Sequence, residues 1–172
     1  EDGDGNGHNT AVGNSSQLNA TTGEFNTSLG SLSIGSGVLT GDNNVAIGYN
    51  SGLNMTSGNT NVFIGSFAGD ALTTGPHNVA IGYEALTTEI THGANTAIGF
   101  RALKTQNAGA HAFNVAVGYS AGLAVTTGIF NTLIGSNAGD AITTGNNNVA
   151  VGMGALGGTT TAANNVAIGV SA

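Results

Sequence analysis

The chain has 172 residues, of which 40% are hydrophobic and only 6% are charged, and its formal net charge is −7. Only Arg101 and Lys104 are basic, so the chain lacks the positive surface that binding to nucleic acid or to an anionic membrane would need. It has no cysteine, which excludes disulfides and thiolate chemistry, and no apolar run of about 18 residues that could insert into a membrane. Many hydrophobic residues with so little charge favour an ordered chain.

Residues 1–8 form an acidic, glycine-rich segment. Within it, Asp2, Asp4 and Asn6 alternate with glycine, as oxygen donors do at the start of a calcium-binding loop. The twelfth position of such a loop is Gly13, where an EF-hand needs glutamate, so the alternatives are a looser Ca²⁺ site and a solvated acidic tail. Because the chain begins with Glu1 and not with methionine, we expect either a mature secreted chain or a piece of a longer one.

A five-residue motif, such as Asn44-Val-Ala-Ile-Gly48, recurs ten times along residues 9–172. Seven of the nine spacings are 17 residues, and the other two are 18 and 19. Such a period predicts a solenoid, in which one repeat forms one rung and buries its apolar face only against its neighbours. The rungs begin at Asn9, Asn26, Asn44, Asn61, Asn78, Asn95, Asn114, Asn131, Asn148 and Asn165.

Each rung contains a strand pattern when its asparagine is counted as position one. Position two is always valine or threonine and position four always aliphatic, and this alternation indicates a β-strand and disfavours a helix. Positions two and four share a face, and we place these twenty side chains inward. The asparagines are expected either to hydrogen-bond to one another along the axis or to cap their own turns.

Two bends close each rung. Position eight is always serine or alanine, which fits a narrow corner, and a second glycine near position fifteen marks the second bend. The fold class is therefore all-β, a parallel β-solenoid of about ten 17-residue rungs, which stack at about 4.8 Å into a rod on the order of 48 Å long. The first bend has a glycine at position five in every rung, where a Cβ would forbid the turn: Gly13, Gly30, Gly48, Gly65, Gly82, Gly99, Gly118, Gly135, Gly152 and Gly169.

Position three faces the opposite way from positions two and four and is expected to point outward. It is alanine in seven rungs and serine in one, while Phe63 and Leu133 occupy it in the remaining two. An apolar stripe along a rod predicts a lateral interface at Phe63 and Leu133. The alternative is that scattered alanines need no partner.

A longer period is superimposed on the rungs. Residues 61–77 resemble residues 131–147, with the same Ala-Gly-Asp-Ala string at 68–71 and 138–141. The offset of 70 residues equals four rungs, so we infer duplication of a four-rung block.

The two ends of the rod predict how copies could join. The last rung stops halfway, at Ala172, and eight residues precede Asn9, so a composite rung would have 16 residues against a period of 17. This near-match favours head-to-tail stacking into a filament that does not close. The alternative is a fragment of a longer repeat protein.

Groups that could support catalysis are scattered. Asp70 and Asp140 lie four rungs apart, about 19 Å, and form no carboxylate pair. We therefore predict no enzymatic activity and no cofactor other than calcium. The histidines fall at or near rung ends, where solvated turns are expected: His8, His77, His92 and His111. Four aromatic residues recur at position six and are expected either to stack on a glycan or to pack at a corner: Tyr49, Tyr83, Phe100 and Tyr119.

The series of Asn-Val-Ala-Ile-Gly rungs, with the small residues that follow each, resembles the head repeats of trimeric autotransporter adhesins and similar repeats in phage tail fibres. The resemblance covers the chain from Asn9 to Ala172. It implies a left-handed parallel β-roll, usually with three chains side by side, at a bacterial or phage surface.

The leading hypothesis is a secreted or surface-attached structural subunit of an extracellular fibre, which assembles with copies of itself by end stacking and lateral packing. The alternative is an adhesin head or a phage tail-fibre shaft that binds a surface glycan or protein. A more distant alternative is ice binding, although the regular Thr-x-Thr array of such proteins is absent.

Overall fold

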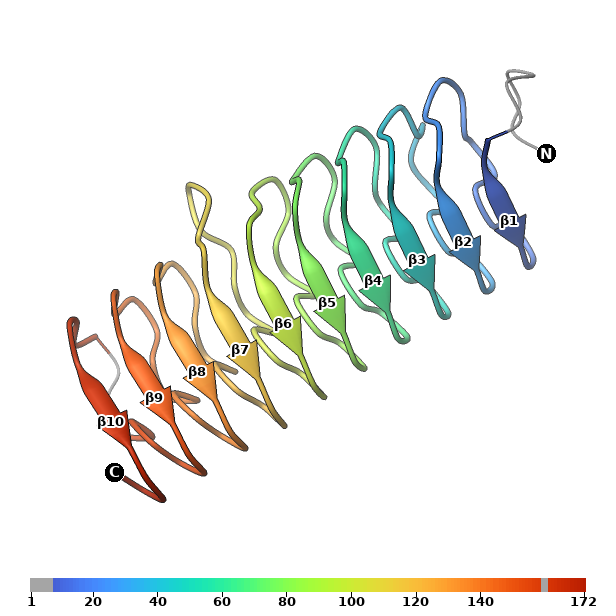
Figure 1. Cartoon of the computed structure of the whole chain (residues 1–172). Coiled ribbons are helices and arrows are strands. Elements are labelled where there is room, and N and C mark those ends of the chain that lie inside the picture. The colour runs from blue at the N-terminus through green and yellow to red at the C-terminus, as the bar shows by residue number, and fades with distance from the viewer. Residues whose placement is uncertain (1–7, 159–160) are drawn as a thin grey trace.

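The computed structural model describes residues 8–158 and 161–172, and it consists of one ten-stranded parallel sheet wound into a solenoid of about nine turns. Figure 1 shows the strands side by side in chain order, with β1 and β10 at opposite ends of a rod. No helix occurs in the described residues, so the predicted all-β solenoid is confirmed. The strands are β1 (Thr10–Val12), β2 (Thr27–Leu29), β3 (Val45–Ile47), β4 (Val62–Ile64), β5 (Val79–Ile81), β6 (Thr96–Ile98), β7 (Val115–Val117), β8 (Thr132–Ile134), β9 (Val149–Val151) and β10 (Val166–Ile168).

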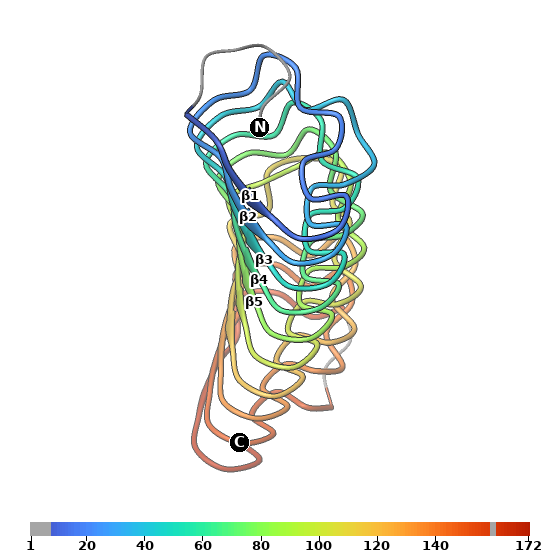
Figure 2. The same ribbon diagram turned by 90° about the vertical axis from the view of Figure 1, so that its right-hand side faces the viewer.

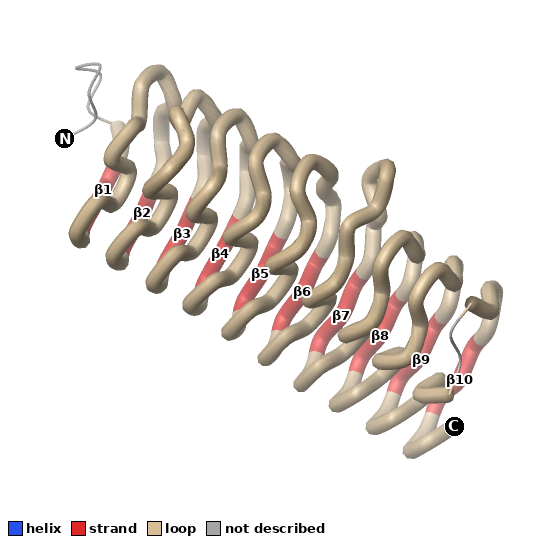
Figure 3. Tube along the Cα trace, turned by 180° about the vertical axis from the view of Figure 1, so that it is seen from behind, coloured by secondary structure: helices blue, strands red, loops and turns tan. Residues whose placement is uncertain are grey.

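Neighbouring rungs pair in register, so that equivalent positions lie beside each other. Val45 pairs with Val62 and Ile47 with Ile64. The backbone N–H of Val45 donates to the carbonyl of Asn61 at 2.8 Å, and the N–H of Gly65 donates back to the carbonyl of Ile47 at 2.7 Å. Figures 2 and 3 show the result, in which each rung lies on the next and the loops return on the side of the rung opposite the strands.

Glycine at position five ends every strand for two physical reasons. The φ angles of these ten glycines lie between 127° and 143°, a region that residues with a Cβ rarely adopt. In addition, a Cβ on Gly82 would lie 2.4 Å from the carbonyl oxygen of Gly99 in the next rung. The ladder therefore requires glycine at this corner.

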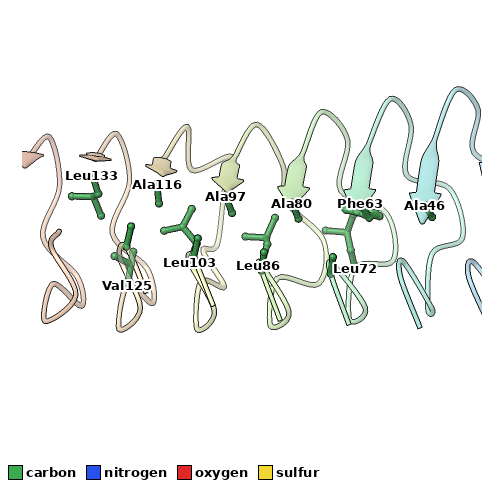
Figure 4. Packing of buried hydrophobic residues seen from close by; sticks show 14 of the residues in the cluster. Ala46, Phe63, Leu72, Ala80, Leu86, Ala97, Leu103, Ala116, Val125 and Leu133 are labelled. Carbon is green, nitrogen blue, oxygen red and sulfur yellow. The ribbon is translucent and has the colours of Figure 1, made fainter. Parts of the chain in front are cut away.

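The orientation of the strands corrects two predictions. Ala46, Phe63 and Leu133, all at position three, are completely buried, whereas positions two and four are half-buried or exposed. The inward placement of positions two and four is therefore wrong, and so is the lateral interface at Phe63 and Leu133. Alternation shows which residues share a face but not which face is inside, and the thin rung accommodates mostly small side chains. Figure 4 shows Ala80 and its equivalents pointing from the strands into the rod.

Large residues at position three are accommodated by glycine on the opposite wall. A Cβ on Gly69 would lie 2.6 Å from the ring of Phe63, and one on Gly52 in the preceding rung would lie 2.9 Å from it. Leu133 is enclosed in the same way by Gly139, at 2.6 Å. The core is thus filled by compensating volumes across the rung.

The asparagines at position one join adjacent rungs and also close their own rung. The Oδ1 of Asn44 accepts from the backbone N–H of Asn61 at 2.9 Å and from its Nδ2 at 3.1 Å. The Nδ2 of Asn44 donates to the carbonyl of Gly58, at the second bend, at 2.8 Å. The axial bonds expected from the sequence are therefore present, whereas the second bond closes the rung at a bend 14 residues away and does not cap a local turn. Fully or almost fully buried members of this ladder are Asn26, Asn44, Asn61, Asn78, Asn95, Asn114, Asn131 and Asn148.

We predict that Asn61→Ala strongly destabilises the rod. The substitution leaves the carbonyl of Gly75 and the backbone N–H of Asn78 without their side-chain partner. An unpaired buried group costs about 1–3 kcal/mol, so the free energy of unfolding should fall by about 3 kcal/mol in denaturant titrations. Asn107→Ala is the control, because Asn107 is exposed, and its effect should lie within about 0.5 kcal/mol. Equal effects of the two substitutions would contradict the ladder.

A second prediction tests which face of the strand is inside. Phe63→Ala should lower the free energy of unfolding by about 3–5 kcal/mol, because it empties a close-packed site. Val62→Ala, at the neighbouring half-buried position, should cost clearly less. Denaturant titration of both variants decides the question, and a larger cost for Val62→Ala would restore the inward placement of position two.

Candidate assembly interface

The side of the sheet that faces away from the core is a continuous strip of uncharged side chains. We call it the outer face, and it consists of positions two and four of all ten rungs. In β3 to β7 these side chains are half-buried, because neighbours in register cover one another. The outer face contains only valine, isoleucine, leucine and threonine: Thr10, Val12, Thr27, Leu29, Val45, Ile47, Val62, Ile64, Val79, Ile81, Thr96, Ile98, Val115, Val117, Thr132, Ile134, Val149, Val151, Val166 and Ile168.

Three exposed phenylalanines border the outer face along the side where the strands begin. Phe25, Phe113 and Phe130 lie two residues before β2, β7 and β8, and about half of each side chain is accessible to solvent. The rings of Phe113 and Phe130 stack at a centroid distance of 5.3 Å. Exposed aromatic rings beside an aliphatic strip are typical of interfaces between proteins.

Both basic residues are bound to a carboxylate of the same chain. The Oε2 of Glu84 accepts from Lys104 Nζ at 2.6 Å and from Arg101 Nε at 2.8 Å. The hydrogen bond from Lys104, supported by that from Arg101, lowers the pKa of Glu84 below its ordinary value of 4.5. These three residues occupy positions seven and ten, so this charge cluster lies off the outer face.

A second aromatic row runs along the corner that follows the strands. We call it the corner row: Tyr49, Phe67, Tyr83, Phe100 and Tyr119. Successive ring centroids lie 5.0–6.0 Å apart. The three tyrosines are between 41% and 57% exposed, so their side chains are accessible from solvent. From Tyr83 to Tyr119 the rings stack on one another, so that the faces within the row are already covered.

The remaining sequence candidates do not converge on one site. Asp2, Asp4 and Asn6 lie outside the described residues, and the calcium site stays a prediction. His77 Nδ1 lies 2.6 Å from Thr60 Oγ1, and His111 Nδ1 accepts from the backbone of Gly93 at 3.1 Å. In residues 8–158 and 161–172, no three histidine or acidic side chains are grouped as a metal site would require. The same residues include no helix that is long and apolar enough to span a membrane.

Comparison of the chain with protein family models, with curated proteins and with solved structures finds no match. The solenoid fold therefore rests on the parallel pairing of the ten strands. The resemblance to adhesin and tail-fibre repeats and the left-handed winding stay predictions.

Asp70 generates a testable pH dependence. Its carboxylate accepts a hydrogen bond from Thr87 Oγ1, but partial burial outweighs this contact and raises the pKa of Asp70 above its ordinary value of 3.8. A raised carboxyl pKa favours the folded state below the unfolded value, and this contribution is lost as the pH rises through the folded value.

We therefore predict that Asp70→Asn raises the melting temperature at pH 7. The amide keeps an oxygen for Thr87 and removes the cost of a partly buried charge. The gain should shrink as the pH is lowered and vanish below about pH 3.8, where the aspartate is also neutral. Thermal melts from pH 3 to pH 7 measure this, and a gain that does not depend on pH would show that the carboxylate charge is not its cause.

Proposed function

We propose that the chain is a structural rod of an extracellular fibre, and that copies of it associate laterally through the outer face. The observation that carries the proposal is the outer face itself, which runs over all ten strands without one charged side chain. A continuous, largely apolar surface of this kind is characteristic of a binding surface. The location outside the cell rests on the resemblance to adhesin and tail-fibre repeats.

The size of the outer face suits an interface between copies. Nine rung spacings of about 4.8 Å give a length of roughly 43 Å, and the five residues from the bordering phenylalanine row to position four span about 17 Å. The product is about 700 Å², close to the ~800 Å² that each partner contributes to a stable interface of standard size.

The distribution of charge supports one mode of association. The described acidic residues, among them Glu24, Asp42, Asp70 and Asp140, all lie at positions other than two and four. The net charge of −7 therefore makes other surfaces of the rod repel one another, while the outer face stays neutral. Lateral contact at the outer face is favoured over random aggregation.

The second candidate is the head of an adhesin or the shaft of a phage tail fibre, in which the same face would join a small, fixed number of chains. The corner row favours this alternative, because its tyrosines remain exposed outside the outer face and are available to a receptor. Stacking of rod ends into a filament is compatible with either candidate and stays a prediction from the repeat pattern.

We predict that Ile81→Asp dissociates the assembly without unfolding the rod. Ile81 is on the outer face, so a carboxylate there remains hydrated in the single chain but would be desolvated in the interface. Sedimentation velocity should show parent protein in assemblies and the variant as single chains, with unchanged circular dichroism.

The matched control is Ala80→Asp in the same strand. Ala80 is completely buried, so this variant should lose its circular dichroism signal and its cooperative melt. Parent protein that sediments as a single chain at high concentration would overturn the proposal. Closed trimers would favour the adhesin or tail-fibre candidate over an open fibre.

A further inference from the structure

The corner row stops at Tyr119, although the rod continues. Position six of the next rung is Ser136, and that of the following rung is Met153, whose side chain is 56% exposed. Tyr119 stacks on Phe100 at 5.0 Å on one side, and no second ring contacts it within the described residues. Because Ser136 carries no ring, the row of rings is interrupted over two rung spacings, about 9.6 Å, between Tyr119 and Met153, and we call this interruption a gap.

The same gap occurs four rungs earlier, and there the chain fills it. Position six is Ser66, between Tyr49 and Tyr83, and the ring of Phe67 lies 5.4 Å from one tyrosine and 6.0 Å from the other. The first gap therefore shows that a space two rungs wide at this corner accepts one six-membered ring.

The second gap has the same backbone but different chemistry. Asn137 stands where Phe67 stands in the first gap, and their φ angles are 56° and 60°, respectively. The backbone N–H of Asn137 donates to the carbonyl of Tyr119 at 2.8 Å, as that of Phe67 does to the carbonyl of Tyr49 at 2.9 Å. The Nδ2 of Asn137 donates to Asp140 Oδ2 at 3.0 Å, and Ser136 Oγ donates to Asn137 Oδ1 at 3.1 Å. The gap thus combines a tyrosine ring with a row of hydroxyl, amide and carboxylate groups.

We propose that the gap at Ser136 binds one pyranose ring of a glycan. A pyranose has an apolar C–H face, which can pack on the exposed ring of Tyr119, and a rim of hydroxyl groups, which can hydrogen-bond to Asn137 and Asp140. Hydroxyl donors to a carboxylate form the stronger, charge-assisted kind of hydrogen bond.

A sugar fits this gap better than an aromatic side chain from another copy. An inserted aromatic ring would cover Asn137 and Asp140 without offering them hydrogen bonds, which is unfavourable for polar groups that lose water. In the first gap, where Phe67 is accommodated, position seven carries no amide, and the equivalent carboxylate, Asp70, already accepts a hydrogen bond from Thr87 Oγ1. The proposal does not depend on lateral packing, since Tyr119, Ser136 and Asn137 lie off the outer face.

The probes are the methyl glycosides of glucose, galactose and N-acetylglucosamine, each added to the full chain at millimolar concentration. We expect saturation-transfer NMR to show contact between protein and at least one of them, with a Kd on the order of 1 mM, as befits one exposed sugar ring. Tyr119→Ala should abolish the signal. Leu18→Ala, which removes an exposed apolar side chain away from the corner row, should leave it unchanged.

Two reciprocal substitutions make the test specific. Asn137→Phe should fill the second gap as Phe67 fills the first and abolish sugar binding, with unchanged circular dichroism. Phe67→Asn should open the first gap and raise the stoichiometry from one sugar per chain to two. Absence of signal from all three glycosides, or binding that survives Asn137→Phe, would overturn the proposal. So would loss of assembly by Asn137→Phe in sedimentation, because the gap would then hold a ring of another copy.

Discussion

The structure depends on the requirement that each rung offer the next one hydrogen-bonding groups at the same positions and at one spacing. Backbone pairing at the strands satisfies part of this requirement, and the buried asparagine ladder satisfies the part at the second bend, where the strand has ended. A shift of the register by one residue would turn Asn61 to the outside and leave the groups that it bonds without a partner. The asparagine at position one therefore holds the register of every rung. The longest rung, residues 95–113, illustrates the rule, because side chains replace displaced partners there. Gln106 Oε1 accepts from Asn114 Nδ2 of the next rung, and the backbone N–H of Ala108 donates to Glu89 Oε2 of the preceding rung.

Within that constraint the core has little room, and its composition follows from volume. Phe63 and Leu133 are possible because glycine stands opposite them, whereas alanine occupies position three where Leu86 or Leu103 fills the opposite wall. The twelfth position follows the same logic. It is apolar and buried in rungs with glycine at position nine, as at Leu72, and it is polar in rungs where leucine at position nine already fills the core. Position three on the strand and positions nine and twelve on the opposite wall therefore fill one shared volume, and the size of the residue at one of them depends on the residues at the others.

This sharing explains what could and could not be predicted from the sequence. The strands, the bend at position five and the axial role of the asparagines follow from strict repetition, because an invariant residue in a stack meets its own copy. The inward face did not follow, because valine and isoleucine at positions two and four are more hydrophobic than alanine at position three. Two signals could have corrected the prediction. Position three lies on the same face of the strand as the asparagine at position one, which is buried, and the large residue Phe63 occurs in the same rung as Gly69, which leaves room for it. The corners at positions seven and seventeen left no signal, since Phe67, Glu84 and Thr60 share no property that indicates their positive φ.

The reversed face is also the strongest argument about function. A solenoid could bury its larger aliphatic residues inside and present alanine to water, yet β3, β5, β6, β7 and β9 do the opposite, with a buried alanine between two larger side chains that face outward. Twenty aliphatic or threonine side chains on the outside would lower solubility without benefit if the rod were solitary, whereas they provide a hydrophobic driving force if another surface covers them. The acidic residues at other positions then keep covered rods soluble. The corner row lies outside the outer face, so the proposed packing face and the proposed recognition edge can coexist on one rod. Along the corner row, Phe67 fills the place that Asn137 occupies four rungs later.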